Sequence, residues 1–130
     1  MINKLQRIMS ELPQVDCPIV DHFSDGVYAR ELVIPEGVCI VGSRHKTNHL
    51  LIILKGVCAI ADNRNPSEVC YGPMVLETKA GTKRAITAIT ETRMLTVHIT
   101  DETDIAKIGD KILEPEPVLP QWKKKALEAI

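Results

Sequence analysis

The sequence predicts a single all-β domain, an antiparallel sandwich or barrel with a short helix at each end. Residues 27 to 99 consist of short Val, Ile, Leu and Thr runs, and turn-forming residues interrupt these runs about every ten residues. A helical spacing of apolar residues occurs only before and after this region. Short strands with regular turns are typical of antiparallel sandwiches and barrels rather than of alternating strands and helices.

The chain starts with a predicted amphipathic helix over residues 2–12. Its apolar residues recur at spacings of three and four, and they are Ile2, Leu5, Met9 and Leu12. Pro13 ends this pattern. We assign residues 1–26 to this helix and a lead-in to the first barrel strand at residue 27.

The strands of the central region are separated by sequences that favour turns. These are PEG at 35–37, KTN at 46–48, DNRNPSE at 62–68, YGP at 71–73 and KAGTK at 79–83. We therefore assign residues 27–100 to one barrel.

A second helix is predicted after Thr100. Ile105, Ile108, Ile112 and Leu113 form one stripe behind the acidic sequence DETD, whose charges favour a helix N-terminus. The sequence EPEPVLPQ then forms a stiff connector, and WKKKALEAI returns to helix-forming composition, so residues 101–130 form the C-terminal part. Because an amphipathic tail with Trp122 leaves apolar surface beyond a complete barrel, we expect a homodimer or a higher homo-oligomer.

Composition excludes several classes of function. The formal charge is −1 and only four residues are aromatic, so neither nucleic acid nor an anionic membrane is an expected partner. No apolar run is long enough for a signal peptide core or a membrane span, and we expect a cytoplasmic protein. The four cysteines show no C-x-x-C spacing, which favours reduced, buried thiols over a zinc site.

Two histidines stand four residues apart in the stretch GSRHKTNHLLIILKG, at His45 and His49. On one straight strand they would lie about 13 Å apart, too far to share an ion. If KTN is a turn, His45 ends one strand and His49 begins the next, and both rings can converge. The sequence LLIIL after them favours strands over a helical H-x-x-x-H pair.

The segment from Gly37 to Gly56 resembles the first motif of the cupin superfamily, also called RmlC-like. That motif has a glycine, five residues, H-x-H, three or four residues, a glutamate, six residues and a glycine. Here Ser43 stands at the first histidine position, His45 at the second and His49 at the glutamate position. The resemblance thus implies a cupin-like antiparallel jelly-roll barrel in which one metal ligand is lost and another has changed identity.

The second cupin motif, roughly P-x-G-x-x-H-x-x-x-N, is matched by KAGTKRAITA with Gly81 in place. Arg84 occupies its histidine position and Ala88 its asparagine position, so a further metal ligand is absent. The chain is also similar to small cupin-like proteins of tailed bacteriophages, in the sequences DHFSDGVYARELVIPEG, HKTNH, GTKR and TVHITDETD. This resemblance implies a fold and a phage origin, without a known activity.

A divalent metal site is one interpretation of the histidines. Since a stable site needs three or four protein ligands, His98 is the best third ligand beside His45 and His49. The alternation in MLTVHI, however, places Leu95, Val97 and Ile99 on one face and His98 on the other. If the aliphatic face is the core, His98 points outward.

The alternative is a cavity without metal that binds an anion. Arg84 brings a permanent charge and a planar fork that suits carboxylate or phosphate, and it would repel an adjacent cation. Arg44, Lys46 and Lys83 in nearby loops would make the mouth cationic. Tyr28 and Arg30 share one face of the first strand and can reach the cavity, although each of these side chains also fits an ordinary packed or paired role.

Three functions follow. We favour a metal-free, phage cupin-like protein that binds a small anionic metabolite or nucleotide through Tyr28, Arg30, Arg44, His45, His49 and Arg84, and so sequesters a host signal. No resident cofactor is then expected, and no catalytic residue is assigned. The alternatives are an enzyme in which His45, His49 and one more ligand hold Fe, Mn, Ni or Zn, and a structural component of a virion.

Overall fold

The computed structural model describes residues 2–114 of the chain. The predicted connector and tail, with Trp122, lie outside the described residues apart from Glu114. Within this range the elements follow the order α1 (Ile2–Met9), β1 (Ile19–Ser24), β2 (Val27–Ile34), β3 (Cys39–Val41), β4 (His49–Lys55), β5 (Val57–Asp62), β6 (Glu68–Tyr71), β7 (Met74–Thr78), β8 (Arg84–Ala88), β9 (Thr92–Ile99) and α2 (Ile105–Ile112). None of these helices is long and apolar enough to cross a membrane.

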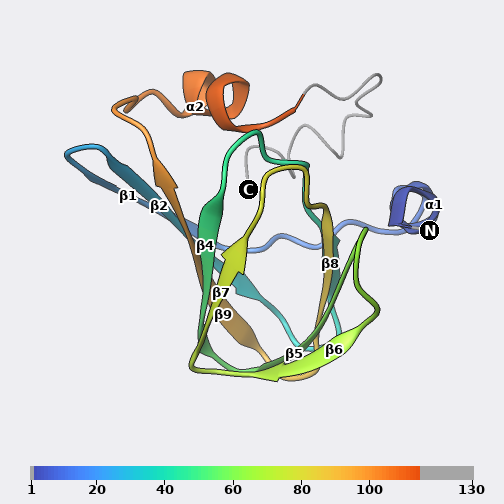
Figure 1. Cartoon of the computed structure of the whole chain (residues 1–130). Helices are drawn as coiled ribbons and strands as arrows, with labels where there is room; N and C mark the ends of the chain where they lie inside the picture. Colours follow the sequence, from blue (N-terminus) through green and yellow to red (C-terminus); the bar gives the residue numbers. More distant parts are fainter. Residues whose placement is uncertain (1, 115–130) are drawn as a thin grey trace.

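The strands form two antiparallel sheets that face each other and enclose the core (Figure 1). One sheet has the order β1-β2-β9-β4-β7 and the other β3-β8-β5-β6. This is the predicted cupin-like jelly-roll with a short helix at each end, and the prediction of fold class is confirmed.

Strict alternation of side chains along the strands builds the core. Along β2 every second residue is buried, and the same holds for Leu51 and Ile53 on β4. The inward aliphatic residues of both sheets meet in one cluster, which contains Leu32, Ile34, Leu51, Ile53, Cys58, Ile60, Cys70, Ile86, Ala88 and Met94. Since this cluster fills the end of the barrel away from α2, the polar inward residues are left near the other end (Figure 1).

The two helices cover different parts of the barrel. α1 packs Ile2 against Val41 and Ala85. α2 starts at the N-cap Asp104, whose side chain accepts a hydrogen bond from the backbone N–H of Ala106. It lies above the end of the barrel at which β4 begins (Figure 1). Its buried residues Ile108 and Ile112 contact Tyr28, so α2 closes this end.

Three local features differ from the expectations. α1 ends at Met9, and residues 10–12 continue only as turns whose N–H groups donate over three or four residues. The lead-in contains strand β1, which pairs with β2 and extends the sheet, so His22 lies on a strand and not in a loop. β3 and β4 belong to different sheets, so residues 42–48 cross between sheets instead of forming a hairpin turn.

Candidate metal and ligand site at the barrel mouth

Three histidines from separate parts of the chain converge beneath α2. His49 is the first residue of β4, His98 lies near the end of β9, and His45 lies in the crossing loop, where it bridges to Leu113. The ring centroids are 4.2 Å apart for His45 and His49, 4.8 Å for His49 and His98, and 5.2 Å for His45 and His98. One nitrogen from each ring lies within 4.8 Å of those of the other two.

The three rings are withdrawn from water and keep ring nitrogens without partners. The exposed fractions are 6% for His45, 8% for His49 and 1% for His98. Neither His98 nitrogen has a hydrogen-bond partner among the described residues, nor does Nε2 of His45. His49 Nδ1 lies 3.3 Å from the Thr47 carbonyl oxygen, and in the tautomer that donates this bond Nε2 keeps its lone pair. Buried polar atoms without partners reduce the stability of the folded state, so a ligand that supplies those partners would stabilise the cluster.

The surroundings keep all three rings neutral. Burial, with smaller effects of the neighbouring His49, His98 and Arg84, lowers the pKa of His45 to about 3. Burial, His49 and Arg30 lower the pKa of His98 to about 3. The pKa of His49 is also lowered, first by burial. Neutral imidazoles have the protonation state that a metal ion requires of its histidine ligands.

His98 faces inward, which corrects the expectation from the alternation of β9. The inward residues of this strand are Thr92, Met94, Thr96 and His98, whereas Leu95 and Val97 are half-buried and Ile99 is exposed. The aliphatic face is therefore the outer face of the sheet. His98 is the register partner of Tyr28 and stacks on its ring at 6.0 Å, beneath the apolar side of α2.

A cavity of about 60 Å³ lies beside the histidines, between the two sheets. Residues of both sheets and of the crossing loop line it, namely Arg30, Leu32, Ile40, Gly42, Ser43, His45, His49, Leu51, Thr78, Thr82, Arg84, Ile86, Met94 and Thr96. Besides His45 Nε2, three polar atoms of these residues are buried without a partner in the described part of the chain: Ser43 Oγ, Thr78 Oγ1 and Arg84 Nε. They lie in a wall whose accessible surface is mainly apolar, so a polar ligand reaches these donors only after small movements of the side chains.

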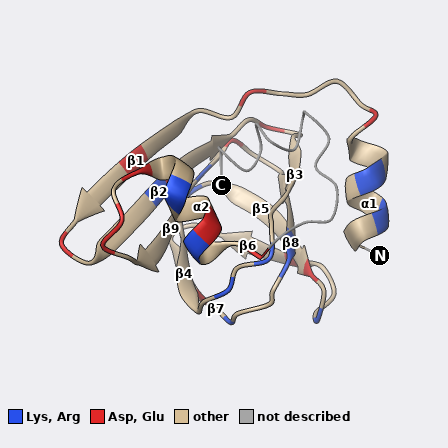
Figure 2. Cartoon of the chain, turned by 90° about the horizontal axis from the view of Figure 1, so that it is seen from above, with Lys and Arg blue, Asp and Glu red and all other residues tan. Residues whose placement is uncertain are grey.

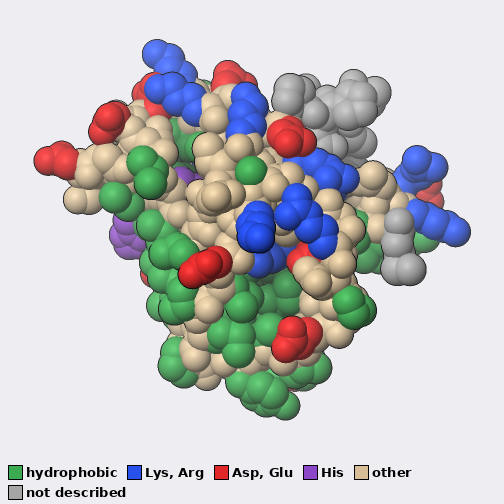
Figure 3. All heavy atoms as spheres, in the orientation of Figure 1, with side chains coloured by type: hydrophobic (Ala, Val, Ile, Leu, Met, Phe, Trp, Pro, Cys, Tyr) green, Lys and Arg blue, Asp and Glu red, His purple; other side chains and the backbone are tan. Residues whose placement is uncertain are grey.

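Arg84 gives this cavity a positive charge. It begins β8 and is the register partner of Asp62 on β5. Burial lowers the pKa of Arg84, and the charge of Asp62 opposes this effect. Further Lys and Arg residues lie on the loops around the mouth (Figure 2), and Lys and Arg side chains gather on the upper part of the surface in Figure 3. They include Arg44, which donates to the Gly81 carbonyl at 3.0 Å, and Lys46, which donates to the Asp110 carbonyl at 2.7 Å.

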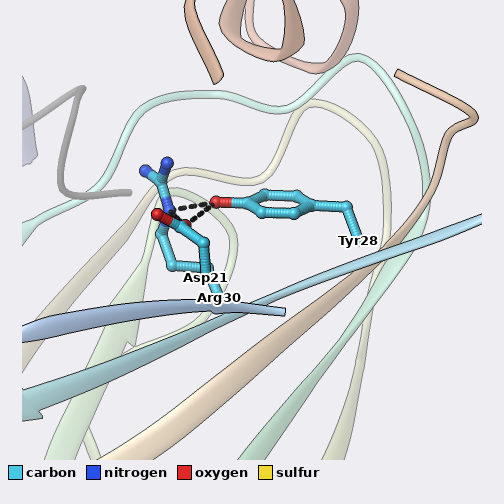
Figure 4. Close-up of polar contacts among 3 residues, drawn as sticks. All are labelled: Asp21, Tyr28 and Arg30. Carbon is cyan, nitrogen blue, oxygen red and sulfur yellow. Dashed lines mark hydrogen bonds and ion pairs between the residues drawn. The ribbon is translucent and has the colours of Figure 1, made fainter. Parts of the chain in front are cut away.

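Tyr28 and Arg30 are joined in a polar network with Asp21 of β1. Figure 4 shows the Tyr28 hydroxyl directed at Asp21 and Arg30. Arg30 Nε lies 3.1 Å from Asp21 Oδ1, and burial together with Asp21 raises the pKa of Tyr28. Tyr28 is therefore engaged behind His98 and does not line the cavity, whereas Arg30 does.

The structure brings four of the six predicted ligand-binding residues to the cavity wall. These are Arg30, His45, His49 and Arg84, whereas Tyr28 and Arg44 lie outside it. Arg44 is held away by its bond to Gly81. His98 completes the predicted metal set although the alternation argued against it.

Sequence reasoning missed Ser43 and Thr78 as functional candidates. Ser43 was noted only as a lost histidine, although a residue at a motif position keeps its inward direction. Thr78 is the register partner of His49 on β7, and so it points to the same side of the sheet. Only the pairing of β4 with β7, which no local pattern encodes, would have identified it.

The donor set fits a transition metal. Zinc binds histidine nitrogen at about 2.0–2.1 Å in tetrahedral geometry, so two nitrogens on one ion lie about 3.4 Å apart. The nitrogens here lie within 4.8 Å of one another, so the rings would rotate inward to hold one ion. Three neutral imidazoles leave one coordination position open toward a ligand, as metal sites that bind substrates do.

Comparison with known proteins supports the fold. No protein-family model matches the chain, and no curated protein matches it in sequence. Among solved structures, the chain is similar to a cupin superfamily protein of Desulfitobacterium hafniense, with a TM-score of 0.57 and 19% identity over 70% of this chain and 84% of that one. It is also similar to an RmlC-like cupin family protein with a double-stranded β-helix fold from Methanocaldococcus jannaschii, with a TM-score of 0.54 and 15% identity over 70% and 88% of the two chains.

A third similar structure is Fe(II) HppE in complex with its substrate. The TM-score is 0.50 and the identity 12%, and the match covers 57% of this chain and 46% of that one. At these identities the likeness shows the fold alone. The chain has a cupin-like barrel, and the first two of these structural neighbours are described as cupin proteins.

Proposed function

We propose that this protein binds a divalent transition metal through His45, His49 and His98 and takes up a small anionic ligand in the cavity beside it. The observation that carries the proposal is the group of three buried, neutral imidazoles whose nitrogens lie within 4.8 Å of one another and largely lack partners. A bound metal would satisfy these lone pairs at once. The inward His98 supplies the third ligand whose absence favoured a metal-free cavity.

The chemistry of the ligands indicates the class of metal. Imidazole nitrogen suits Zn, Fe, Ni and Cu, whereas Mg and Ca prefer oxygen ligands. HppE, a neighbour in fold only, was solved with Fe(II), which is compatible with a metal in this type of barrel. We propose Zn, Fe or Ni for this chain, with Mn less suited to an all-nitrogen set.

The position of Arg84 explains why the ligand is an anion. A guanidinium and a divalent ion near the same cavity repel each other, and burial strengthens that repulsion. An anion that lies between them attracts both charges and offsets the repulsion. The same ligand receives the free donors of Ser43, Thr78 and Arg84. Metal and Arg84 are therefore compatible when an anion accompanies the metal.

The size of the cavity restricts the ligand. A water molecule needs about 10–15 Å³ of such space, so a cavity of about 60 Å³ holds roughly four to six waters. A small carboxylate or a comparable oxyanion fits this space, and a nucleotide does not fit within it. We therefore propose a small anionic metabolite. Phage origin and sequestration of a host signal stay predictions from the sequence resemblance.

The proposal is ligand binding and not acid–base catalysis. No Asp or Glu is among the cavity-lining residues of the described chain, so no carboxylate is placed to move a proton. A bound metal supplies Lewis acidity to an oxygen ligand. The residues of this chain orient that ligand through Arg84, Ser43 and Thr78, and exclude water through α2 and the apolar side of the cavity.

Metal titration tests the histidine centre. We expect the metal-stripped protein to bind one equivalent of Zn²⁺ or Ni²⁺, measured by calorimetry and by mass spectrometry of the native protein. His98→Ala removes one of three ligands, and we expect affinity to fall at least as far as the roughly 10–100-fold caused by loss of an outer-shell partner.

The matched control is His22→Ala. His22 is a histidine outside the site, with its side chain 52% exposed. This variant keeps wild-type affinity if the buried cluster is the metal site. Equal metal binding by the wild type and His98→Ala, or no binding by the wild type, overturns the metal part of the proposal.

Anion binding tests the role of Arg84. We expect acetate, oxalate or inorganic phosphate to bind the metal-loaded protein, with the best of these weakened about tenfold to a hundredfold by Arg84→Met, because a charge-assisted hydrogen bond is lost. The control is Arg93→Met, an arginine on the outside of the barrel. If Arg84→Met binds all three anions like the wild type, the anion part of the proposal is wrong even where the metal binds.

A further inference from the structure

The outer face of the five-stranded sheet carries a continuous apolar surface. Its members are outward residues of four neighbouring strands, Val27, Ala29, Leu50, Ile52, Val75, Leu95, Val97 and Ile99, which we call the outer apolar patch. In the space-filling view hydrophobic side chains gather over the lower part of the barrel, where β4, β7 and β9 lie (Figure 3).

Strand register shows that the patch is contiguous. One row pairs Val27 with Ile99 across β2 and β9. The next row runs from Ala29 through Val97 to Leu50, and a third runs from Leu95 through Ile52 to Val75. Residues opposite each other on neighbouring strands have Cβ atoms about 4.5–5.5 Å apart, so these side chains touch within and between the rows.

Several members of the patch are strongly exposed in the single chain. Ile99 is 87% exposed and Val75 is 62% exposed. A contiguous apolar surface of this kind is rare on monomeric proteins and marks an interaction site. The opposite sheet also exposes Val69 and Tyr71 on β6, but its other outward residues include the small Ala59 and Ala61, and α1 covers Ala85.

We infer that the outer apolar patch is the interface of a homodimer in which two copies of this chain pack sheet against sheet. At about 3.3 Å per residue and about 4.8 Å between strands, the five strands give each copy a face of roughly 500 Å². Two such faces bury about 1,000 Å², which reaches the lower limit for a specific interface. Sheets pack face to face with strands within about 30° of each other, so one twisted face fits its own copy.

The charges on this face are placed for a two-fold arrangement. Lys55 and Arg93 are opposite each other on neighbouring strands at the end of the sheet near Gly56. Glu77 is opposite Leu50 near the other end. Glu31, beside the patch, is already paired with Arg93 at 3.8 Å. A two-fold axis across the strands sets Lys55 of each copy near Glu77 of the other. An apolar centre with a polar margin is the usual composition of a homodimer interface.

Val75→Glu and Ile99→Glu test this interface in the full chain. Because both side chains are mostly exposed in one copy, their replacement does not disturb the core, and circular dichroism checks that the fold is retained. We expect sedimentation equilibrium to show a wild-type dimer and at least about a hundredfold rise in the dimer dissociation constant for either variant, since each interface then contains two carboxylates without partners.

The matched control is Val69→Glu. Val69 is 48% exposed on β6 of the opposite sheet, so the same charge change there leaves the dimer intact. A wild-type chain that stays monomeric at concentrations of tens of micromolar overturns the inference. So does a dimer that resists both Val75→Glu and Ile99→Glu.

Discussion

Single side chains decide the chemistry of the barrel mouth, because identical residue types behave differently with burial. His22 is exposed and pairs with Glu31 at 3.7 Å, whereas His45 and His98 are buried and neutral. A ring held neutral by burial binds protons weakly and keeps its lone pair for a metal. This difference provides a pH test that needs no ligand.

The metal-free protein should lose stability as the pH falls below about 6.5. In the folded state His45 and His98 have a pKa of about 3, whereas the rings of the unfolded chain have the ordinary value of 6.5. The unfolded chain therefore binds more protons between these values. The contribution of these rings to the free energy of unfolding is fully present above pH 6.5. It decreases as the pH falls toward 3, by about 1.4 kcal/mol per pH unit for each ring.

Urea unfolding in the presence of a chelator between pH 7.5 and pH 5 measures this slope before most carboxylates titrate. His98→Leu removes one of three titrating rings, and we expect more than half of the slope to remain, because His45 and His49 also have lowered pKa values. His22→Ala is the control that keeps the whole slope. A wild-type stability that stays constant across this range would show that the buried rings are already protonated or exposed.

The sequence identified these residues unevenly for physical reasons. The glycine spacing around His45 and His49 fixed their direction, since a motif position keeps its inward side. His98 was placed outward because alternation defines two faces of β9 without saying which one meets the core. The aliphatic face was the natural choice, yet in this protein the outer face of the sheet is the aliphatic one.

Among the elements, two glycines differ in their surroundings, one between two strands and one inside a helix. Gly56 joins β4 to β5 with φ +104°, and a Cβ there would lie 2.4 Å from the Glu91 carbonyl oxygen. Gly109 lies in α2, and a Cβ there meets nothing within 4 Å. The two glycines thus provide a matched pair for the same substitution.

Gly56→Ala should destabilise the protein by at least about 2 kcal/mol, because a left-handed backbone and a backbone clash act together. Gly109→Ala should stabilise it by up to about 1 kcal/mol through helix propensity. Chemical denaturation of both variants gives the two changes in the free energy of unfolding. Equal effects of the two substitutions would mean that the tight approach of Gly56 to Glu91 does not exist in solution.

Element prediction was most reliable where turn residues recur. The turns before β4, β6 and β8 were located by Gly, Pro and Asn clusters, and α2 by its apolar stripe. Strand β1 was missed because its sequence IVDHFS mixes apolar and polar residues, and it becomes a strand by pairing with β2. Partners distant in sequence therefore decide what local propensity leaves open.

In the whole molecule, the two sheets enclose an apolar cluster at one end of the barrel and a polar site at the other. The aliphatic cluster lies at one end, and the histidines, Arg84 and the cavity lie at the other beneath α2. The fold class followed from strand texture and glycine spacing. The site followed only in part, because its geometry depends on the pairing of β4 with both β7 and β9. Oligomerisation was expected from the tail, whereas the structure provides a surface for it on the sheet.

The separation of the histidines along the chain has a consequence for protein synthesis. His45 and His49 leave a ribosome together, whereas His98 follows 49 residues after His49. At roughly 5–20 residues per second this interval lasts several seconds, during which a nascent chain offers only a pair of ligands. The centre exists once β9 has inserted between β2 and β4. In the proposed metal-binding protein, loading would thus be a late event, and the newly made barrel would have to remain folded with three vacant imidazoles until an ion arrived.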